Sequence, residues 1–338
     1  MNLIICPKSW GGVEYHRLII PFKNIEDTKI ASTLEGISAA EMKNNNISQV
    51  WYNRNICQKN NPLPILIEIR KSGAKIVIDI DDYWDVPYGH VLKSSWKEGN
   101  IKNLYAHQIQ FADYIVVTNQ QLADTIVKEL KVNPKKIIIA PNAIDPNENQ
   151  YNQKFKYKLN ELFWQGSVTH HHDLKQIAPI VSDIQNINFH MAGYDMRADQ
   201  EWTKTEAMFK LGNRFKRIIS TPCDSYMNGY IGKGLCLIPL ENTKFNKHKS
   251  NLKLIESGWA KKPVIVSGIH PYLPLAKDGV NCVTAYSAKS WMRAIMSILN
   301  EPNYADDIRF QLYDDIKANY LIHHANKARI DLINYING

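Results

Sequence analysis

Short apolar runs recur along the whole chain and alternate with longer segments of helical periodicity. Uninterrupted apolar runs separated by helices are typical of parallel β-sheets covered on both faces. The runs form one set in each half of the chain, at 3–6, 29–32, 50–53, 75–80, 114–118 and 136–140, and at 162–166, 187–193, 217–220, 236–240, 263–267 and 281–286. This pattern predicts an α/β protein with two Rossmann-like, doubly wound domains that face a cleft.

The chain has 338 residues, which is long enough for two domains of ordinary size. A polar segment at 145–160 follows the last strand of the first set and is expected to be the linker. We therefore place an N-terminal domain at 1–150 and a C-terminal domain at 151–315. An amphipathic helical tail at 316–338 is expected to pack back on the N-terminal domain.

Composition narrows the class of protein. Hydrophobic residues make up 44% and charged residues 22%, as in soluble globular proteins. No apolar run approaches the roughly 20 residues of a membrane span, and the N-terminus lacks the features of a signal peptide. The five cysteines are scattered, and none forms a CxxC motif, so a reducing cytoplasm is the expected location.

The chain is basic, with a formal net charge of +8. Such a balance favours anionic ligands or surfaces, namely nucleotides, nucleic acid or acidic lipid headgroups, although a merely basic surface is the alternative. Peripheral contact with a membrane is compatible with this charge.

Ligands of open α/β sheets bind beyond the carboxyl ends of the strands, so the motifs that follow strands are informative. Gly11 and Gly12 follow the first strand and precede a helix, which suggests a phosphate-binding loop, but two glycines alone are a weak signal and a plain tight turn is the stronger interpretation. The chain contains neither GxGxxG nor a P-loop, and this weighs against a dehydrogenase and a P-loop kinase.

Acidic residues crowd the end of the fourth strand, in the sequence VIDIDDYWDVP at 77–87. Asp79 and Asp81 alternate to one face of the strand, and Asp82 follows. Adjacent carboxylates can bind a metal, act as a base, or raise each other's pKa, and they can also cap a helix. Tyr83 and Trp84 add aromatic surface that can stack on a sugar or a base, or fill the core.

The first strand of the second half leads into Gly166 and Ser167, followed by three histidines at 170–172. Three consecutive residues cannot all face one metal ion. We expect instead that one of them donates to a phosphate or a sugar hydroxyl.

Six lysines surround a single carboxylate, Glu256, between positions 244 and 262. Ser250 is expected to cap a helix from about 251 to 260, whose first amides attract anions. Lys249, Lys253 and Glu256 would then share one face of that helix.

Leu252, Ile255 and Trp259 would share the other face and pack on the sheet. This arrangement suits a nucleoside diphosphate, with lysines offsetting its charge and the glutamate binding hydroxyls. A solvated, lysine-rich helix is the alternative.

At this point the sequence resembles the GT-B glycosyltransferases, and in particular the retaining, nucleotide-sugar-dependent group (family 4-like, group 1). Four segments carry the resemblance: GGVEYHR; ADYIVVTNQQLADTIV with IIIAPNAID; QGSVTHHHDL; and LIPLENTKFNKHKSNLKLIESGWAKKPVIVS. In that group the helix before a PVI strand carries the diphosphate-binding amides and a glutamate for the donor ribose, and Glu256 stands at that glutamate.

The resemblance implies a donor-binding C-terminal domain and an acceptor-side N-terminal domain. The implied donor-binding residues are Gly11, Gly12, Gly166, Ser167, His170, Asn246, Lys249, Ser250, Asn251, Leu252, Lys253 and Glu256. The implied catalytic residues are Asp81, Asp82 and Lys249, and the implied acceptor-binding residues are Glu14, His16, Arg17, Tyr83 and Trp84.

The chain departs from the common pattern of that group at two places. Many members carry two glutamates spaced E-x7-E, and the earlier position here is His248. Many also carry an arginine and a lysine after the first strand of the second domain, whereas 165–173 contains neither. Lys249, Lys253 or one of the histidines would have to substitute.

The expected activity is transfer of a sugar from a nucleotide diphosphate donor to an acceptor hydroxyl, with retention and without a metal. No cofactor is expected beyond the nucleotide-sugar co-substrate. The acceptor is a glycan, a lipid-linked glycan or a modified DNA base, and an anionic one fits the net charge. Two alternatives stay open: a metal-dependent GT-A-like transferase that uses Asp79 and Asp81, and a non-catalytic protein that binds sugar nucleotides or nucleic acid.

Overall fold

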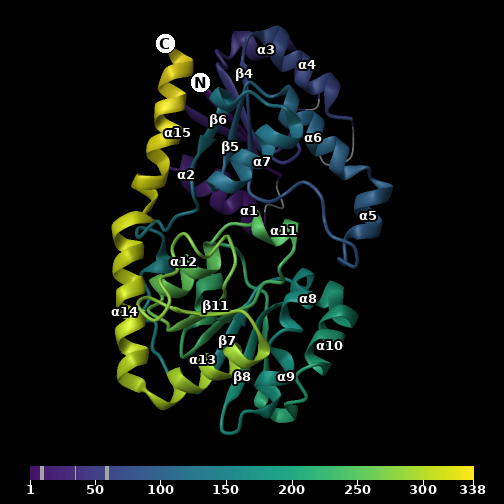
Figure 1. The fold of residues 1–338 in the computed structure, drawn as a ribbon. Helices are drawn as coiled ribbons and strands as arrows, with labels where there is room; N and C mark the ends of the chain where they lie inside the picture. Colours follow the sequence, from purple (N-terminus) through teal and green to yellow (C-terminus); the bar gives the residue numbers. More distant parts are fainter. Residues whose placement is uncertain (8–10, 35, 58–60) are drawn as a thin grey trace. The chain divides into compact units, whose positions relative to one another are not determined.

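The computed structural model describes residues 1–7, 11–34, 36–57 and 61–338, which form two compact α/β units (Figure 1). Unit 1 contains Met1–Ala143, His248–Ser250 and Ile322–Gly338. Unit 2 contains Ile144–Lys247 and Asn251–Leu321. The sequence places the boundaries at 150 and 315, whereas the compact units change over after Ala143 and Leu321.

Each of the twelve apolar runs forms a strand, and all the strands pair in parallel within two six-stranded sheets. The strands of unit 1 are β1 (Asn2–Ile5), β2 (Thr28–Ala31), β3 (Gln49–Asn53), β4 (Lys75–Ile80), β5 (Tyr114–Val117) and β6 (Ile137–Ile139). Those of unit 2 are β7 (Glu161–Gln165), β8 (Asn188–Tyr194), β9 (Phe215–Ile219), β10 (Cys236–Ile238), β11 (Val264–Ser267) and β12 (Val283–Ala285).

Helices connect the strands throughout both units. The α-helices are α1 (Gly12–Glu14), α2 (Ile20–Phe22), α3 (Ala39–Asn44), α4 (Leu63–Ser72), α5 (Lys93–Glu98), α6 (Ile101–Phe111), α7 (Gln120–Leu130), α8 (His171–Leu174), α9 (Ala178–Asp183), α10 (Asp199–Ala207), α11 (Lys244–Lys247), α12 (Leu252–Trp259), α13 (Ala288–Asn300), α14 (Pro302–Asn319) and α15 (Ile322–Asn337). A π-helical segment at Tyr15–Ile19 joins α1 to α2, and short 3-10 helices occupy Pro134–Lys136, Asn149–Tyr151, Val168–His170, Met196–Ala198, Gly212–Arg214 and Tyr226–Tyr230.

The strand order identifies the point in each sheet where a ligand is expected. The order is β2-β1-β3-β4-β5-β6 in unit 1 and β12-β11-β10-β7-β8-β9 in unit 2. The winding direction therefore reverses between β1 and β3, and again between β7 and β10. Doubly wound sheets bind ligands beyond the carboxyl ends of the strands at such reversals.

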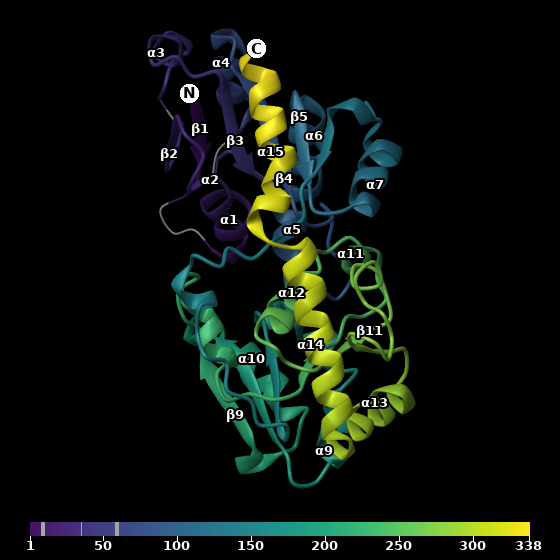
Figure 2. The same cartoon turned by 90° about the vertical axis from the view of Figure 1, so that its left-hand side faces the viewer.

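The core of unit 1 is completed by the last helix of the chain. Figure 2 shows α15 lying along the strands of this sheet. Leu332 and Ile333 of α15 are buried in one cluster with Trp51 of β3, Val77 of β4 and Val116 of β5. Burial of such side chains is the main favourable term in folding.

In unit 2, successive residues of β7 enter different cores. Leu162 and Trp164 join one buried cluster, and Phe163 between them joins another. Strand residues alternate between the two faces of a sheet, so each face of this sheet must be covered by its own layer of helices. Continuous apolar sequence is the direct result of burial on both faces.

The segment at 145–160, expected to be a linker, is packed into unit 2. Tyr151 is buried in the same cluster as Phe163, and the indole of Trp259 donates to its carbonyl at 2.8 Å. The polar composition of this segment reflects its irregular backbone rather than a free connection.

Within residues 1–7, 11–34, 36–57 and 61–338, no helix combines the length and the apolar character needed to cross a bilayer.

Gly193 provides a test of how tightly the end of β8 packs on the turn after β7. Its φ is +108°, and a Cβ atom would lie 2.0 Å from the carbonyl oxygen of Gly166. We expect Gly193→Ala to lower the free energy of unfolding by about 3 kcal/mol or more, because backbone cannot yield as a side chain can. Urea unfolding followed by tryptophan fluorescence measures this.

Gly212→Ala is the matched control, because Gly212 also has a positive φ, of +55°, but nothing lies within 4 Å of its added Cβ. This variant should lose only roughly 1–2 kcal/mol of its free energy of unfolding, which is the cost of placing a residue with a Cβ atom in the left-handed region. Equal losses in the two variants would show that the close approach to Gly166 does not matter.

Candidate functional site

The candidate site in unit 2 begins at the turn after β7, beside the reversal between β7 and β10. A Cβ at Gly166 would approach the Trp164 ring to 2.7 Å and the Lys253 ammonium to 3.1 Å. Only a glycine therefore fits between that indole and that lysine. The sequence predicts both Gly166 and Lys253 as donor-binding residues, and the structure brings them together.

Three side chains at this turn form a hydrogen-bonded chain. The Lys253 ammonium lies 2.9 Å from Nε2 of His170, and Nδ1 of His170 lies 2.6 Å from a carboxylate oxygen of Asp173. A lysine ammonium only donates, so Nε2 of His170 accepts and its Nδ1–H donates to Asp173. This assignment gives a neutral imidazole between an anion and a cation.

Asp173 anchors this chain to the loop after β10. Its other carboxylate oxygen accepts from the backbone amide of Glu241 at 2.7 Å and from the side-chain amide of Asn246 at 2.8 Å. The carboxylate is buried and joins elements from both sides of the reversal. We did not predict this role for Asp173, although its spacing of three residues from His170 on one helical turn was the available signal.

The start of α12 differs from the expectation. The helix begins at Leu252, with Asn251 as its N-cap residue and without a side-chain capping bond. Ser250 does not cap it, because its hydroxyl accepts a bond of 2.9 Å from the side-chain amide of Asn142. Lys249 lies outside the helix, so it cannot share a helical face with Lys253.

The buried face of α12 is also shifted from the expected one. Leu254 and Ile255 are fully buried, whereas Leu252 and Trp259 are only half-buried. Gly258 lies against α14, where an added Cβ would meet Ile316 at 2.2 Å and Leu312 at 2.6 Å. The need to pack α14 closely sets which residues face inward, and this long-range contact is absent from the local periodicity.

Glu256 is buried on α12 beside two tyrosines. Its carboxylate accepts hydrogen bonds from the hydroxyl of Tyr226 and, at 3.5 Å, from that of Tyr230. Burial raises the pKa of Glu256 to about 7, and the tyrosine hydroxyls and Lys253 oppose that rise only in part. The position predicted to bind a ribose is therefore a carboxyl group with a strongly perturbed proton affinity.

Three further predicted residues lie near this turn. The Ser167 hydroxyl is 2.5 Å from that of Thr169, and the side-chain amide of Asn246 is held by Asp173 as described. Asn251 donates from its side chain to the Tyr320 hydroxyl at 3.3 Å. These contacts fix the loops on both sides of Lys253.

In unit 1, the acidic end of β4 is paired with arginines. Arg17 binds Asp79 through two bonds, of 2.8 and 2.9 Å, and both side chains are about 1% exposed. Arg17 also donates to the carbonyl of Ala140 at 2.8 Å and to the side chain of Asn142 at 3.1 Å. The structure does not support the expected contact of Arg17 with an acceptor, because its guanidinium group forms its hydrogen bonds within this buried network.

Asp81 and Asp82 share a different arginine. Arg54 binds Asp81 through two bonds, of 2.7 and 2.8 Å, and reaches Asp82 at 3.0 Å. The Lys249 ammonium lies 3.6 Å from Asp82. Burial acts against ionisation of Asp81, but Arg54 outweighs it, and the net effect lowers the pKa of this carboxyl.

Arg54 was not predicted, although a signal for it existed. It directly follows β3, the neighbour of β4, and the carboxyl ends of parallel strands meet at one edge of a sheet. A basic residue after one strand and acids after the next should therefore have been expected to pair.

The remaining predicted residues of unit 1 line its interior or a helix start. Tyr83 and Trp84 are 7% and 2% exposed, so both rings fill the core and stacking on a sugar would require them to move. His16 is also buried, and burial lowers its pKa to about 3. The carboxylate of Glu14 accepts from the amide of Gly11 at 2.9 Å, which fixes the start of α1.

Gly12 has open space around its Cα, with nothing within 4 Å of an added Cβ. Residues 8–10 of the preceding loop lie outside the described residues.

The arginine pairs bear on the metal-dependent alternative. Asp79 and Asp81 do alternate as predicted, but each carboxylate is bound by an arginine fork, and this geometry opposes a shared metal between them. In the described part of the chain, no cluster of three or more His, Cys, Asp or Glu side chains has the arrangement of a metal site.

Comparison with solved structures identifies the fold. The chain is similar to Anabaena Alr3699/HepE, solved in complex with UDP and glucose, with a TM-score of 0.73 and 12% identity over 98% of this chain and 99% of that chain. It is similar to a glycosyltransferase from Rickettsia africae ESF-5, with a TM-score of 0.69 and 13% identity over 99% of this chain and 98% of that one.

The pneumococcal O-GlcNAc transferase GtfA, in complex with UDP and GlcNAc, matches with a TM-score of 0.60 and 13% identity over 88% of this chain and 59% of that chain. No protein-family model matches the sequence, and neither does any curated protein. The expected fold class, two Rossmann-like domains of the GT-B type, is confirmed.

The perturbed carboxyl of Glu256 should make the stability of the protein depend on pH. Its folded pKa of about 7 exceeds the ordinary value of 4.5. Between these values the unfolded chain releases a proton that the folded chain retains, so the free energy of unfolding falls as the pH rises. The Glu256→Gln variant has no carboxyl group at this position, so its free energy of unfolding should not show this fall. The difference in free energy of unfolding between the variant and the parent should therefore shift in favour of the variant by about 3 kcal/mol between pH 4.5 and pH 7.5.

Urea unfolding at a series of pH values measures this difference. Glu241→Gln, at an exposed carboxyl of the same unit, is the control for removing one negative charge. An unchanged pH slope in Glu256→Gln would contradict the assignment.

Proposed function

We propose that this protein is a glycosyltransferase that transfers a sugar from a nucleoside diphosphate donor to an acceptor hydroxyl. The observation that carries the proposal is the Lys253–His170–Asp173 chain beside Gly166, at the first turn of α12 and at the reversal of strand order in unit 2. It combines a fixed cation, a helix N-terminus and a glycine that lets the backbone of the turn lie close to that cation. All three are suited to a diphosphate.

The similar structures favour uridine as the nucleoside. Alr3699/HepE was solved with UDP and with UDP-glucose, and GtfA with UDP and GlcNAc. We infer that the present chain also takes a UDP-sugar. The identity is 12–13%, so this inference rests on the shared fold together with the lysine and glycine at the turn.

Departure of the diphosphate is the step that the residues of unit 2 would assist. Negative charge develops on the leaving phosphate as its bond to the sugar breaks, and a fixed cation with aligned amides stabilises that charge. Lys253 supplies the cation, the first amides of α12 supply the dipoles, and Asp173 orients His170 so that its Nε2 faces the lysine. In this proposal no metal ion is needed, and the sugar keeps its anomeric configuration.

On the acceptor side we propose that Asp82 and Lys249 act, with Asp81 positioned by Arg54. Asp82 has the more exposed carboxylate, at 20% against 12% for Asp81. It can orient an acceptor hydroxyl or stabilise positive charge on the sugar. The acceptor is a glycan, a lipid-linked glycan or a modified DNA base.

Incubation of the protein with a panel of UDP- and GDP-sugars, with mass spectrometry of the products, tests the proposal. Release of free nucleoside diphosphate from at least one donor is the expected result. Binding of a donor without any turnover would favour the non-catalytic alternative. Turnover that is lost in EDTA and restored by manganese would favour the metal-dependent one.

Lys253→Gln should reduce turnover of the donor by roughly 100- to 1000-fold, the range seen when one stabilising contact to a developing charge is removed. The glutamine keeps a similar length but loses the charge. Steady-state release of UDP measures the effect. Lys175→Gln, at an exposed lysine of the same unit, is the matched control and should leave turnover within about twofold.

Asp82→Asn should lower the single-turnover rate by roughly 100-fold or more and leave the affinity for UDP unchanged. The reason is that the donor diphosphate is assigned to unit 2, whereas this carboxylate belongs to unit 1. Calorimetry gives the affinity, and rapid quenching gives the rate.

Asp85→Asn serves as the control for Asp82→Asn, because Asp85 pairs with Lys93 and Lys102 at 3.1 Å each in the same acidic segment. A normal rate in folded Asp82→Asn would remove this residue from the proposed mechanism.

A further inference from the structure

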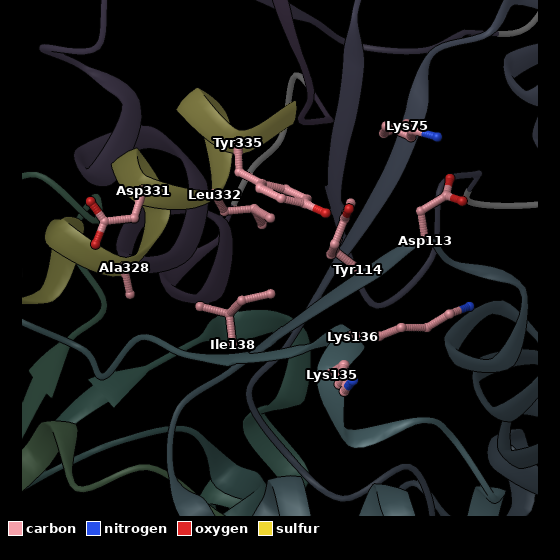
Figure 3. Close-up of a pocket in the computed structure, with 10 residues that line it drawn as sticks. All are labelled: Lys75, Asp113, Tyr114, Lys135, Lys136, Ile138, Ala328, Asp331, Leu332 and Tyr335. Carbon is pink, nitrogen blue, oxygen red and sulfur yellow. The ribbon is translucent and has the colours of Figure 1, made fainter. Parts of the chain in front are cut away.

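Unit 1 contains a pocket that lies at the opposite end of the strands from the acidic residues at the end of β4. Its volume is about 640 Å³, within the range of small-molecule sites. Lys75 and Tyr114, the first residues of β4 and β5, contribute to it, and Leu332 and Tyr335 of α15 contribute from the other side (Figure 3). The pocket is therefore formed at the amino ends of the strands, away from Asp79 at the end of β4.

One side of the pocket is cationic. Lys75, Lys135 and Lys136 line it, and Figure 3 shows Lys75 and Lys136 on the same side of Tyr114 as Asp113. Lys136 donates to the carbonyl of Ala112 at 3.0 Å. In the described part of the chain, no carboxylate lies within ion-pair distance of the side chains of Lys75 or Lys135.

The two carboxylates of the pocket are already engaged. Asp113 accepts from the backbone amide of Ile76 at 2.9 Å, and Asp331 pairs with Lys327 at 3.2 Å. The three lysines therefore outnumber the acids, and the pocket as a whole is positive.

The other side of the pocket is aromatic and aliphatic. The rings of Tyr114 and Tyr335 meet edge to face, with centroids 6.3 Å apart and planes at 88°. Burial, together with the neighbouring Tyr335, raises the pKa of Tyr114, so its hydroxyl stays neutral. Ile138 and Leu332 form the wall beside them (Figure 3). Tyr335 is a large ring that is 74% exposed, whereas Leu332, one turn earlier on the same helix, is buried.

We propose that this pocket binds a small organic phosphate, with the phosphate among the three lysines and the organic body against Tyr335 and Leu332. Lysine ammonium groups favour a phosphate monoester by charge and hydrogen bonding, and an aromatic edge beside an aliphatic wall favours a ring or a short hydrocarbon. This binding is independent of the proposed sugar transfer. The same phosphate chemistry occurs in soluble metabolites and in lipid headgroups.

Calorimetry on the full chain with phenyl phosphate as the probe tests the pocket, with phenol and inorganic phosphate as comparison ligands. Phenyl phosphate should bind more tightly than either comparison ligand. The double variant Lys75→Gln/Lys135→Gln should weaken phenyl phosphate by about tenfold, because two partly solvated ion pairs are lost. Tyr335→Ala should weaken phenyl phosphate but leave inorganic phosphate unchanged.

The matched control is Lys43→Gln/Lys128→Gln, which removes two exposed lysines of unit 1 outside the pocket. This control distinguishes binding in the pocket from a general effect of the positive charge of the protein. Far-UV circular dichroism establishes that each variant is folded.

Sedimentation with vesicles distinguishes the two sources of phosphate. If the parent but not Lys75→Gln/Lys135→Gln sediments with phosphatidylcholine vesicles that contain phosphatidic acid, the phosphate belongs to a lipid. If neither sediments and phenyl phosphate still binds, it belongs to a soluble ligand. The proposal is overturned if phenyl phosphate does not bind, or if the control variant weakens it as much as the pocket variant does.

Discussion

Unit 1 depends on the ion pairs that one buried carboxylate, that of Asp79, forms with arginines. This carboxylate meets Arg17 in a two-bond pair, and Arg329 of α15 lies 3.7 Å from its second oxygen. Arg17 continues to the carbonyl of Ala140, directly after β6. One carboxylate thus joins the helical segment after β1, the end of β4 and the last helix of the chain. Removing one partner of a buried pair typically costs about 3–5 kcal/mol, because the other charge is left unpaired.

The second arginine at this site, Arg329, is buried at a cost in electrostatic free energy. Burial lowers the pKa of Arg329 to about 9, and the charge of Arg17 adds to that effect while Asp79 opposes it. Two guanidinium groups around one carboxylate leave an excess of positive charge in a buried place. This network holds Asp79 in a structural role, and Asp82, whose carboxylate is 20% exposed, is the acid that we propose for the chemistry.

The strands could be predicted from the sequence alone, but the pairing of the charged residues could not. The central strands were predictable because burial on both faces of a sheet requires continuous apolar sequence, as in β3 and β4. Arg17 and Asp79 are 62 residues apart, and Arg54 and Asp81 are 27 apart, so only the order of the strands in the sheet, and no local pattern, can indicate that they pair. The capping role of Ser250 was wrongly predicted for the same reason, because its hydroxyl bonds to Asn142, which is 108 residues away.

In the candidate site, the sequence predicted Gly166, His170 and Lys253 but not how they connect. Three consecutive histidines cannot share one metal ion, and the informative relation is between His170 and Asp173. A local spacing can suggest such a pair, but the second role of Asp173, holding Asn246, depends on the order of strands in the sheet.

Unit 1 is discontinuous in the sequence, and this affects how the chain folds during its synthesis. Leu332 and Ile333 complete its core, yet the ribosome makes them after all of unit 2. At roughly 5–20 residues per second, the sheet of unit 1 waits on the order of ten to forty seconds for its covering helix. Its apolar face stays open to chaperones during that interval. The unit that is encoded second is therefore the first that can finish folding.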